Sequence, residues 1–199
     1  MSLSLLPLPQ AEVLLDPEFL PLPAAEALLA ELTATIAWRQ EPITLFGKPV
    51  LQPRLTAWYG DPAARYAYSG LALEPQPWTP ALLRLREQVQ AAAGSPFNSV
   101  LLNLYRTGQD SMGWHADNEP ELGPAPVIAS VSLGAARRFR FRPRHPQQLL
   151  HEPVSLLLPA GSLLLMRGST QQHWLHAVPK TAVPTGPRLN LTFRLVTER

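Results

Sequence analysis

Short apolar or alternating segments dominate the second half of the chain. They occupy residues 100–105, 127–133, 138–142, 154–158, 162–166 and 189–196, and Pro and Gly residues separate them. Many short strands with turns between them are typical of a double-sheeted jelly roll or cupin-like barrel. We therefore predict a mainly β fold with flanking helices (α+β), whose core is a double-stranded β-helix.

Helical periodicity is confined to two stretches of the first half. Residues 24–38 carry leucines at helical spacing, which predicts a first helix. A second helix is expected to begin at Thr79-Pro80, with Thr as the N-cap, and to end at Gly94. Strands are expected at residues 43–49, 53–60 and 66–70, and residues 1 to about 22, rich in Leu and Pro, should run extended along the surface.

Composition narrows the classes of protein. With 199 residues, the chain can form one domain with a sizeable core. No apolar run approaches the roughly 20 residues of a membrane span, so we expect no membrane association. The chain has no cysteine, which fits a cytoplasmic protein and leaves His, Asp and Glu as metal ligands. A net charge of +2 is too small to indicate a nucleic-acid partner by itself.

A His-x-Asp pair is the first candidate for chemistry. His115 and Asp117, together with a distant histidine, offer two imidazoles and one carboxylate to a single metal. This ligand set characterises non-haem Fe(II) oxygenases. Taken alone, however, such a pair is more often found on a surface loop. The spacing does not choose among the later histidines, which are His145, His151, His173 and His176.

A polar strand face near the C-terminus suggests a cosubstrate. Alternate residues of a strand share a face, so Arg188, Asn190, Thr192 and Arg194 should point one way. Two guanidiniums on one face suit a ligand with two carboxylates, such as 2-oxoglutarate. Alone, the arginines would fit ordinary surface ion pairs. Together with the metal motif, they indicate an Fe(II)- and 2-oxoglutarate-dependent dioxygenase.

Two further groups have both a structural and a functional interpretation. The arginines at 137, 138, 140, 142 and 144 are either a solvated strand face or a phosphate-binding surface. Tyr66 and Tyr68 are either ordinary sheet residues or platforms on which bases stack.

The whole pattern resembles the AlkB family of nucleic-acid dealkylating dioxygenases, closest to its duplex-acting, mammalian-type branch. The resemblance runs from about residue 46 to residue 194. Its motifs are Phe46-Gly47-Lys48, Pro53-Arg54, Trp58-Tyr59-Gly60-Asp61, Tyr66-Ala67-Tyr68-Ser69-Gly70, Asn98-Ser99-Val100-Leu101-Leu102-Asn103-Leu104-Tyr105, His115-Ala116-Asp117, Ile128-Ala129-Ser130-Val131-Ser132-Leu133-Gly134, His173-Trp174-Leu175-His176 and Arg188-Leu189-Asn190-Leu191-Thr192-Phe193-Arg194.

The resemblance implies a set of cofactor residues. The catalytic iron would be held by His115, Asp117 and His176, because the place within Trp-x-His selects His176 over His173. O2 would be the second cosubstrate, and Arg188 would pair with the distal carboxylate of 2-oxoglutarate. The full set implied for 2-oxoglutarate is Asn103, Tyr105, Arg188, Asn190 and Arg194.

The resemblance also implies a substrate site. Phe46 would fill the gap in a duplex, Arg54 would steady the lesion strand, and Tyr68 would stack on the flipped base. The full implied set is Phe46, Gly47, Lys48, Arg54, Tyr66, Tyr68, Asn118 and Glu119. Asn118 stands where duplex-acting relatives commonly carry Asp. Either Glu119 supplies the negative charge, or the substrate range shifts toward neutral etheno adducts.

The implied function is DNA repair. The enzyme would remove the methyl groups of 1-methyladenine and 3-methylcytosine and release formaldehyde, succinate and carbon dioxide. Etheno adducts would be an extension of this substrate range. We expect a monomer with residues 1–97 as an N-terminal extension and recognition lid and residues 98–199 as the catalytic core. Its partner would be alkylated DNA, duplex or single-stranded. The alternatives are an oxygenase of the same fold acting on RNA, protein or a small molecule, and a non-catalytic binding module.

Overall fold

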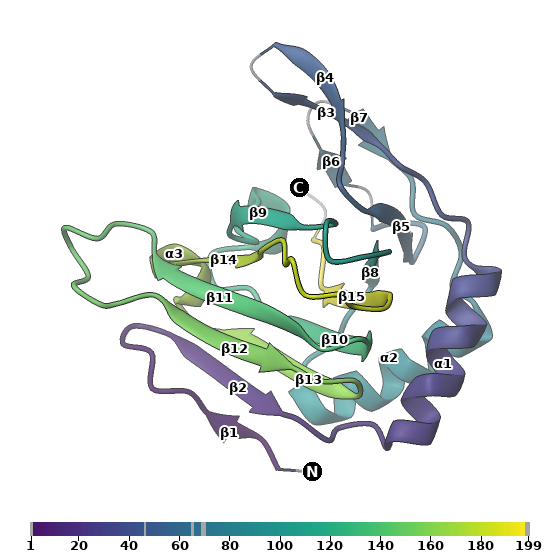
Figure 1. Cartoon of the computed structure of the whole chain (residues 1–199), viewed down its shortest axis with the longest axis horizontal. Coiled ribbons are helices and arrows are strands. Elements are labelled where there is room, and N and C mark those ends of the chain that lie inside the picture. The colour runs from purple at the N-terminus through teal and green to yellow at the C-terminus, as the bar shows by residue number, and fades with distance from the viewer. Residues whose placement is uncertain (1, 46, 65, 69–70, 198–199) are drawn as a thin grey trace.

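Two antiparallel β-sheets form the centre of the protein (Figure 1). The computed structural model describes residues 2–45, 47–64, 66–68 and 71–197. Within these ranges, the side chains of residues 43–45, 66–68 and 71–73 are not described. The larger sheet contains, in spatial order, β1 (Ser4–Leu5), β2 (Glu12–Asp16), β13 (Ser162–Arg167), β10 (Ile128–Gly134), β15 (Arg188–Arg194), β8 (Ser99–Tyr105) and β5 (Leu55–Gly60). The smaller sheet contains β12 (Val154–Leu158), β11 (Arg137–Pro143), β14 (Trp174–Val178) and β9 (Met112–His115). This architecture confirms the predicted double-sheeted core.

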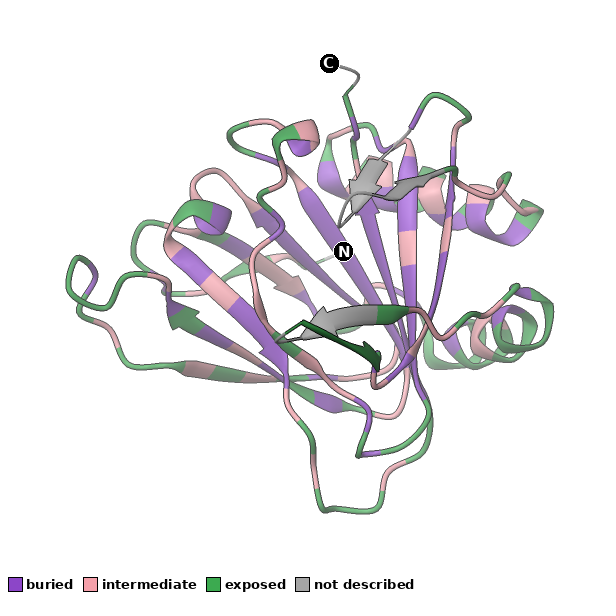
Figure 2. Cartoon of the chain, turned by 90° about the horizontal axis from the view of Figure 1, so that it is seen from above, coloured by how far each residue is buried: buried purple, intermediate pink, exposed green. Residues whose placement is uncertain are grey.

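Two helices, α1 (Leu22–Thr35) and α2 (Pro80–Ala93), cover the outer face of the larger sheet (Figures 1 and 2). The ends of α2 are as predicted: Thr79 accepts a hydrogen bond from the Leu82 backbone, and Gly94 has a left-handed φ of 61°. Helix α1 ends at Thr35, before the expected residue 38. The next residues run extended, because Arg39 pairs with Thr56 of β5 (N to O 2.9 Å).

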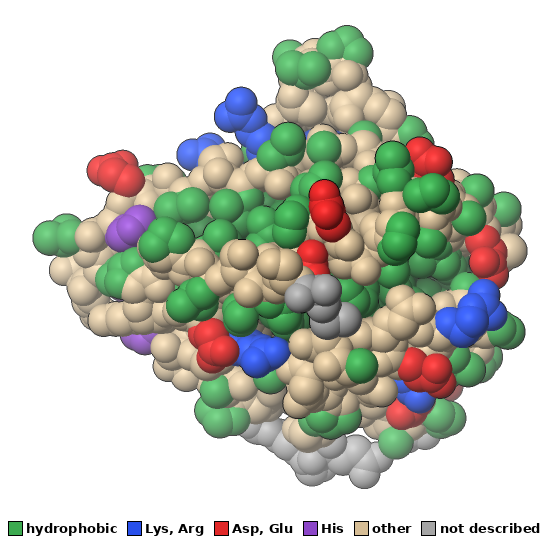
Figure 3. Space-filling model, turned by 90° about the horizontal axis from the view of Figure 1, so that it is seen from below, with side chains coloured by type: hydrophobic (Ala, Val, Ile, Leu, Met, Phe, Trp, Pro, Cys, Tyr) green, Lys and Arg blue, Asp and Glu red, His purple; other side chains and the backbone are tan. Residues whose placement is uncertain are grey.

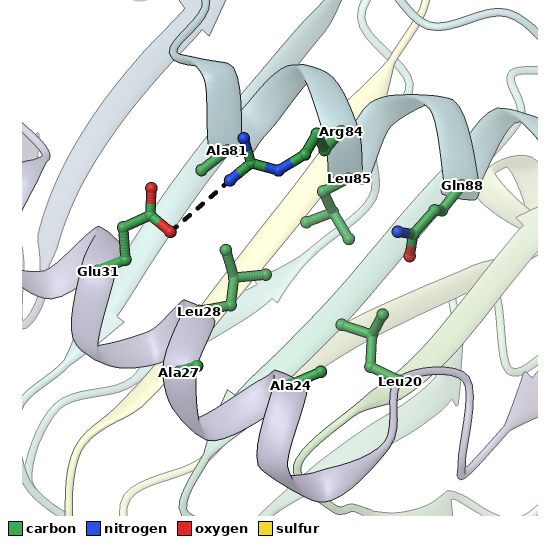
Figure 4. Close-up of a pocket in the computed structure, with 9 residues that line it drawn as sticks. All are labelled: Leu20, Ala24, Ala27, Leu28, Glu31, Ala81, Arg84, Leu85 and Gln88. Carbon is green, nitrogen blue, oxygen red and sulfur yellow. Dashed lines mark ion pairs between the residues drawn. The ribbon is translucent and has the colours of Figure 1, made fainter.

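A shallow groove separates α1 from α2 on the surface (Figure 4). Leu28 and Leu85 lie in its floor, and Glu31 and Arg84 form an ion pair of 3.9 Å across it. Both charged side chains are exposed, so this pair contributes little to stability.

The alternating pattern of β15 sorts its side chains as predicted. Leu189, Leu191 and Phe193 enter the apolar cluster between the larger sheet and the helices. The polar residues Arg188, Asn190 and Thr192 therefore face the space between the two sheets, where they are buried.

The N-terminal segment is part of the larger sheet, which extends the sequence-based expectation of a surface strand. Strand β2 pairs with β13 from Asp16↔Leu163 to Glu12↔Arg167, and Trp174 Nε1 donates to the Pro9 carbonyl at 2.9 Å. Three strands that precede residue 98, namely β1, β2 and β5, thus belong to this sheet.

Two hairpins project beyond β5 at one end of the sheets (Figure 1). They are β3 (Pro42–Leu45) with β4 (Lys48–Leu51), and β6 (Tyr66–Tyr68) with β7 (Leu71–Leu73). The short helices η1 (Pro120–Leu122) and α3 (Thr170–His173) complete the fold. Within the part of the chain that the structure describes, no helix has the length and apolarity that crossing a bilayer requires.

Candidate active site

The two strands that carry the predicted metal ligands are neighbours in the smaller sheet. His115 on β9 and His176 on β14 are direct partners, with ring centroids 4.2 Å apart. Asp117 follows β9, and one ligand atom from each of the three residues lies within 4.8 Å of the others. Among the described residues this is the group that could hold a metal; His173 lies on α3, before β14, and is not part of it.

Both imidazoles are set up to offer a lone pair. His115 Nδ1 lies 2.9 Å from the Gly113 carbonyl, and since a carbonyl only accepts, Nδ1 carries the proton. Its Nε2 is thereby left as the ligand atom. Burial, assisted by the neighbouring His115, lowers the pKa of His176 to about 3, so its imidazole is neutral at physiological pH. Phe139 stacks on the His176 ring at 5.3 Å and fixes its plane.

Asp117 is held by two contacts from other parts of the chain. Its Oδ1 accepts a hydrogen bond from Arg194 Nη2, and its backbone N–H donates to Gln171 Oε1 at 2.9 Å. Its Oδ2 lies 3.7 Å from His176 Nε2. Burial raises the pKa of Asp117, but the Arg194 guanidinium, together with electrostatic interactions with His176 and His115, outweighs burial and lowers the pKa below the usual value. The carboxylate is therefore ionised and has one oxygen directed at the histidines.

The contact from Gln171 could not be predicted from the sequence. Gln171 is buried on α3, whereas its neighbour Gln172 is exposed and donates to the Pro124 carbonyl. No local pattern distinguishes two adjacent glutamines, and only the folded chain brings one of them to Asp117.

Arg188 is a buried cation whose surroundings suit an anionic ligand. It is 1% exposed, and Nη2 donates to Ser132 Oγ at 2.9 Å. Nε and Nη1 have no hydrogen-bond partner among the described residues. Its guanidinium carbon lies 5.3 Å from the centroid of the Tyr105 ring. A buried cation with unmet donors is costly unless a ligand completes it, and a carboxylate matches its fork.

The strand register places the other predicted cosubstrate residues beside Arg188. Tyr105 is the partner of Arg188 in the β8–β15 ladder, and Asn103 is the partner of Asn190. The Asn190 amide is engaged within the protein, because it donates to Ser130 Oγ (2.7 Å) and accepts from Thr192 Oγ1 (3.0 Å). A direct contact of Asn190 with a ligand stays a prediction.

The residues predicted to bind the substrate are spread over several elements. Gly47 and Lys48 are exposed at the tip of the β3–β4 hairpin, whereas Arg54 is buried and bonded to Asn103. Phe46 lies outside the described residues. Tyr66 and Tyr68 form β6, but their side chains lie outside the described ones.

The two predicted substrate residues that follow Asp117 differ in their surroundings. Asn118 is exposed, and with its amide turned to satisfy both groups it donates to the Ala116 carbonyl (3.3 Å) and accepts from Arg144 Nη1 (3.0 Å). Glu119 has one buried carboxylate oxygen with no partner among the described residues. This oxygen is available to a hydrogen-bond donor of a ligand.

The arginines of β11 divide between two faces, which corrects the expectation of a single solvated row. Arg138, Arg140 and Arg142 point outward, and the last two lie over the Trp114 ring at 5.7 and 4.6 Å. Arg137 is buried and donates to the carbonyls of Thr107, Asp110 and Pro179. It shares the inward face with Phe139, so its role is to join loops rather than to meet solvent.

The surface seen from below carries acidic and basic side chains interspersed (Figure 3). No large region of one charge forms on the face that this view shows. The outward arginines of β11, Arg138, Arg140 and Arg142, form a cationic row that a polyanion can meet.

Fold and site together define a class of protein: a double-stranded β-helix whose two sheets enclose a His-Asp-His cluster and a buried arginine. The chain belongs to the 2OG-Fe(II) oxygenase superfamily, whose family model matches residues 12–194. It is an Fe(II)- and 2-oxoglutarate-dependent dioxygenase of the AlkB type, and O2 is its second cosubstrate.

Individual relatives agree with this assignment. The chain is 42% identical over 200 residues to alpha-ketoglutarate-dependent dioxygenase alkB homolog 3 of Bos taurus. This match covers 98% of the chain and 69% of the relative. It is 46% identical over 159 residues to DNA oxidative demethylase ALKBH2 of Bos taurus, covering 77% and 57%. The solved structure described as "The structure of OsALKBH1" superposes with a TM-score of 0.67 at 16% identity, over 98% of this chain and all of that one, and supports the fold.

Proposed function

We propose that the protein is a DNA repair dioxygenase that removes alkyl groups from N-alkylated bases. The observation that carries the proposal is the convergence of His115, Asp117 and His176 beside the buried cation Arg188. The similarity to a relative named DNA oxidative demethylase supports DNA as the substrate. We expect the enzyme to act as a monomer.

In this proposal the iron would be held by His115, Asp117 and His176, through the two imidazoles and one carboxylate oxygen. The donor set fits, because two imidazoles and one carboxylate suit Fe(II). When bound, the iron with 2-oxoglutarate and O2 supplies an oxidation that hydroxylates the N-alkyl carbon and leaves succinate and carbon dioxide. A hydroxylated N-methyl group then leaves the base as formaldehyde: the electron pair of the C–N bond returns to the ring nitrogen, and the hydroxyl proton passes to solvent.

The remaining work of the chain is to hold and orient the cosubstrate. Arg188 would pair with its distal carboxylate through Nε and Nη1. Asn103 and Tyr105 would donate to it from the same sheet face. Arg194 would keep Asp117 Oδ1 occupied, so that one oxygen of the carboxylate remains for the metal.

The substrate base must leave the duplex to reach this enclosed site, which costs a few kcal/mol and less for a base that cannot pair. This cost would be offset by Phe46, acting as a wedge in the duplex, and by Tyr66 and Tyr68, on which the base would stack. Gly47 and Lys48 at the hairpin tip would lie beside the DNA backbone. Glu119 would accept from the exocyclic amine of the base, and Asn118 would face the adduct. Arg140 and Arg142 would contact phosphates.

The test uses matched duplex and single-stranded DNA oligonucleotides that carry 1-methyladenine, 3-methylcytosine or ethenoadenine, with an RNA oligonucleotide of the same sequence. Restored base is quantified by mass spectrometry with Fe(II) and 2-oxoglutarate present. The proposal predicts restoration of DNA bases that requires both additions and is absent in His176→Ala. Restoration confined to RNA, or turnover of 2-oxoglutarate with no restored base, would overturn it.

A further inference from the structure

Arg54 is a buried cation at the base of the β3–β4 hairpin. The residue is only 6% exposed, and each of the three nitrogens of its guanidinium donates a hydrogen bond to a neutral acceptor. Nε donates to Asn103 Oδ1 at 2.7 Å, Nη1 to the Ser111 carbonyl at 3.3 Å, and Nη2 to Gln52 Oε1. Among the described residues no carboxylate pairs with it. Its position is therefore determined by neutral hydrogen bonds inside the protein.

The contact with Asn103 decides which way the Asn103 amide faces. A guanidinium can only donate, so the amide atom 2.7 Å from Arg54 must be the oxygen. The NH2 group of Asn103 then points away from Arg54. Asn103 lies opposite Asn190 on the inner face of the larger sheet, two residues from Tyr105. An NH2 group in that place can donate to an anionic oxygen of a ligand that Arg188 holds.

The contact with Gln52 links Arg54 to the hairpin. Gln52 directly follows β4, and its backbone N–H donates to the Glu41 carbonyl at 3.1 Å. Its own carbonyl accepts from Gln40 Nε2 at 2.9 Å, which closes the base of the hairpin. The chain of contacts Gln52–Arg54–Asn103 thus runs from the exposed hairpin to the inner face of the larger sheet, where Asn103 lies.

We propose that Arg54 is a positioning residue for the cosubstrate, which it serves by fixing the Asn103 amide with its NH2 group toward 2-oxoglutarate. Gln52 holds Arg54 in this place from the hairpin side. This differs from the contact with the lesion strand that family resemblance implies for Arg54, because the guanidinium is buried and all its nitrogens are engaged. The inference rests on the proposed function, namely on the binding of 2-oxoglutarate by Asn103.

The test measures 2-oxoglutarate affinity by calorimetry on the full chain loaded with Mn(II), without nucleic acid or turnover. Arg54→Gln removes the guanidinium that contacts Asn103, and Gln52→Leu removes the acceptor that holds Arg54 from the hairpin side. Arg54→Lys keeps the positive charge but replaces the guanidinium fork with a single ammonium group. Arg167→Gln is the matched control, since Arg167 is partly buried on β13 and donates to the Ala93 carbonyl. Affinity of each variant for an alkylated oligonucleotide is measured separately without 2-oxoglutarate.

We expect Arg54→Gln to weaken 2-oxoglutarate binding roughly 10-fold, Gln52→Leu by about 3-fold, and Arg54→Lys by an intermediate factor. Oligonucleotide affinity should stay at the wild-type value in these variants, and Arg167→Gln should retain wild-type 2-oxoglutarate affinity. In turnover assays, the KM for 2-oxoglutarate should rise by more than kcat falls.

Wild-type 2-oxoglutarate affinity in Arg54→Gln together with weakened oligonucleotide binding would overturn the inference in favour of a strand contact. Asn103→Asp separates the two levels of the argument, because it keeps the acceptor for Arg54 and loses the NH2 donor. If Asn103→Asp weakens 2-oxoglutarate binding and Arg54→Gln does not, this inference alone fails. If neither does, the assignment of Asn103 fails as well. Should Arg54→Gln not fold, as judged by circular dichroism, Gln52→Leu decides, and unchanged affinity there overturns the inference.

Discussion

His115 and His176 face each other across the β9–β14 ladder, with ring centroids 4.2 Å apart and no intervening residue. Sixty-one positions separate them in the chain, so their proximity is a product of strand pairing alone. Sheet geometry therefore fixes the two imidazoles, and only the third ligand, Asp117, depends on a loop.

Because His176 is a proposed metal ligand and His173 is not, replacing them should have different effects on iron binding. His176→Ala should lose stoichiometric iron binding and 2-oxoglutarate turnover, because it removes a ligand that sheet pairing places on the metal. His173→Ala, three residues earlier on α3, should keep both. Bound iron and succinate are measured in each. Iron loss in the His173 variant instead would contradict the ligand assignment.

The low pKa of His176 predicts how the metal-free protein responds to acid. Its folded pKa is about 3 and its ordinary value is 6.5, so between these the unfolded chain binds more protons than the folded one. Stability is therefore complete above the ordinary value and is lost as the pH falls, by up to about 1.4 kcal/mol per pH unit. Urea unfolding of the chelator-treated protein between about pH 7 and pH 5 measures this loss. His176→Gln should show a flatter profile, and parallel profiles would refute the explanation.

Arg188 should oppose folding in the absence of its ligand. Arg188→Met removes a buried cation with two unmet donors. The free energy of unfolding of the metal-free variant should therefore rise by about 1 kcal/mol or more, and its urea midpoint should rise with it. The same variant should lose at least roughly 100-fold in 2-oxoglutarate affinity, the order expected when a buried charge-assisted contact is lost. Denaturation and calorimetry test the two halves. A destabilised variant with normal affinity would mean that Arg188 is purely structural.

Gln171 should act on the metal through Asp117. Gln171→Leu removes the acceptor of the Asp117 N–H and should weaken metal affinity roughly 10-fold while leaving the three ligands in place. Gln172→Leu is the control, because Gln172 is exposed and contacts Pro124. Competition with a chelator measures the affinities. Equal metal loss in both variants would point to a general disturbance of α3.

Arg140 and Arg142 should contribute to DNA affinity without sequence preference. Replacing both by Ala should weaken binding of every oligonucleotide tested and reduce the slope of log affinity against log salt by about 2. Arg84→Ala, in the groove between α1 and α2, is the control. An unchanged salt slope would show that this face does not meet the phosphate backbone.

Local signals in the sequence were sufficient for the elements that they determine directly. The cap residues Thr79 and Gly94 bound α2 as predicted, because capping is decided by a few neighbouring residues. The alternation of β15 likewise places Leu189 and Arg188 on opposite sides of the sheet. The same rule assigns Arg137 to the inward face with Phe139, a signal that the interpretation of the arginines as one row overlooked.

Other features depend on contacts between distant parts of the chain. Strands β9 and β14 have no clear alternation, and their extended form comes from pairing: β14 lies between β9 and β11 and pairs with both. The contacts of Gln171 with Asp117 and of Arg54 with Asn103 span 54 and 49 positions. Such pairs leave no periodic pattern, so the sequence predicts the residue types of the site but not the side chains that hold them in place.

The most direct test of the central claim compares two products of the same reaction. Succinate and formaldehyde are quantified in parallel while the enzyme acts on a 1-methyladenine duplex with Fe(II) and limiting 2-oxoglutarate. The account predicts equal amounts of the two products, together with an equal amount of restored adenine. Succinate formed without formaldehyde or restored adenine would contradict it, because the oxidation would then act on something other than the alkylated base.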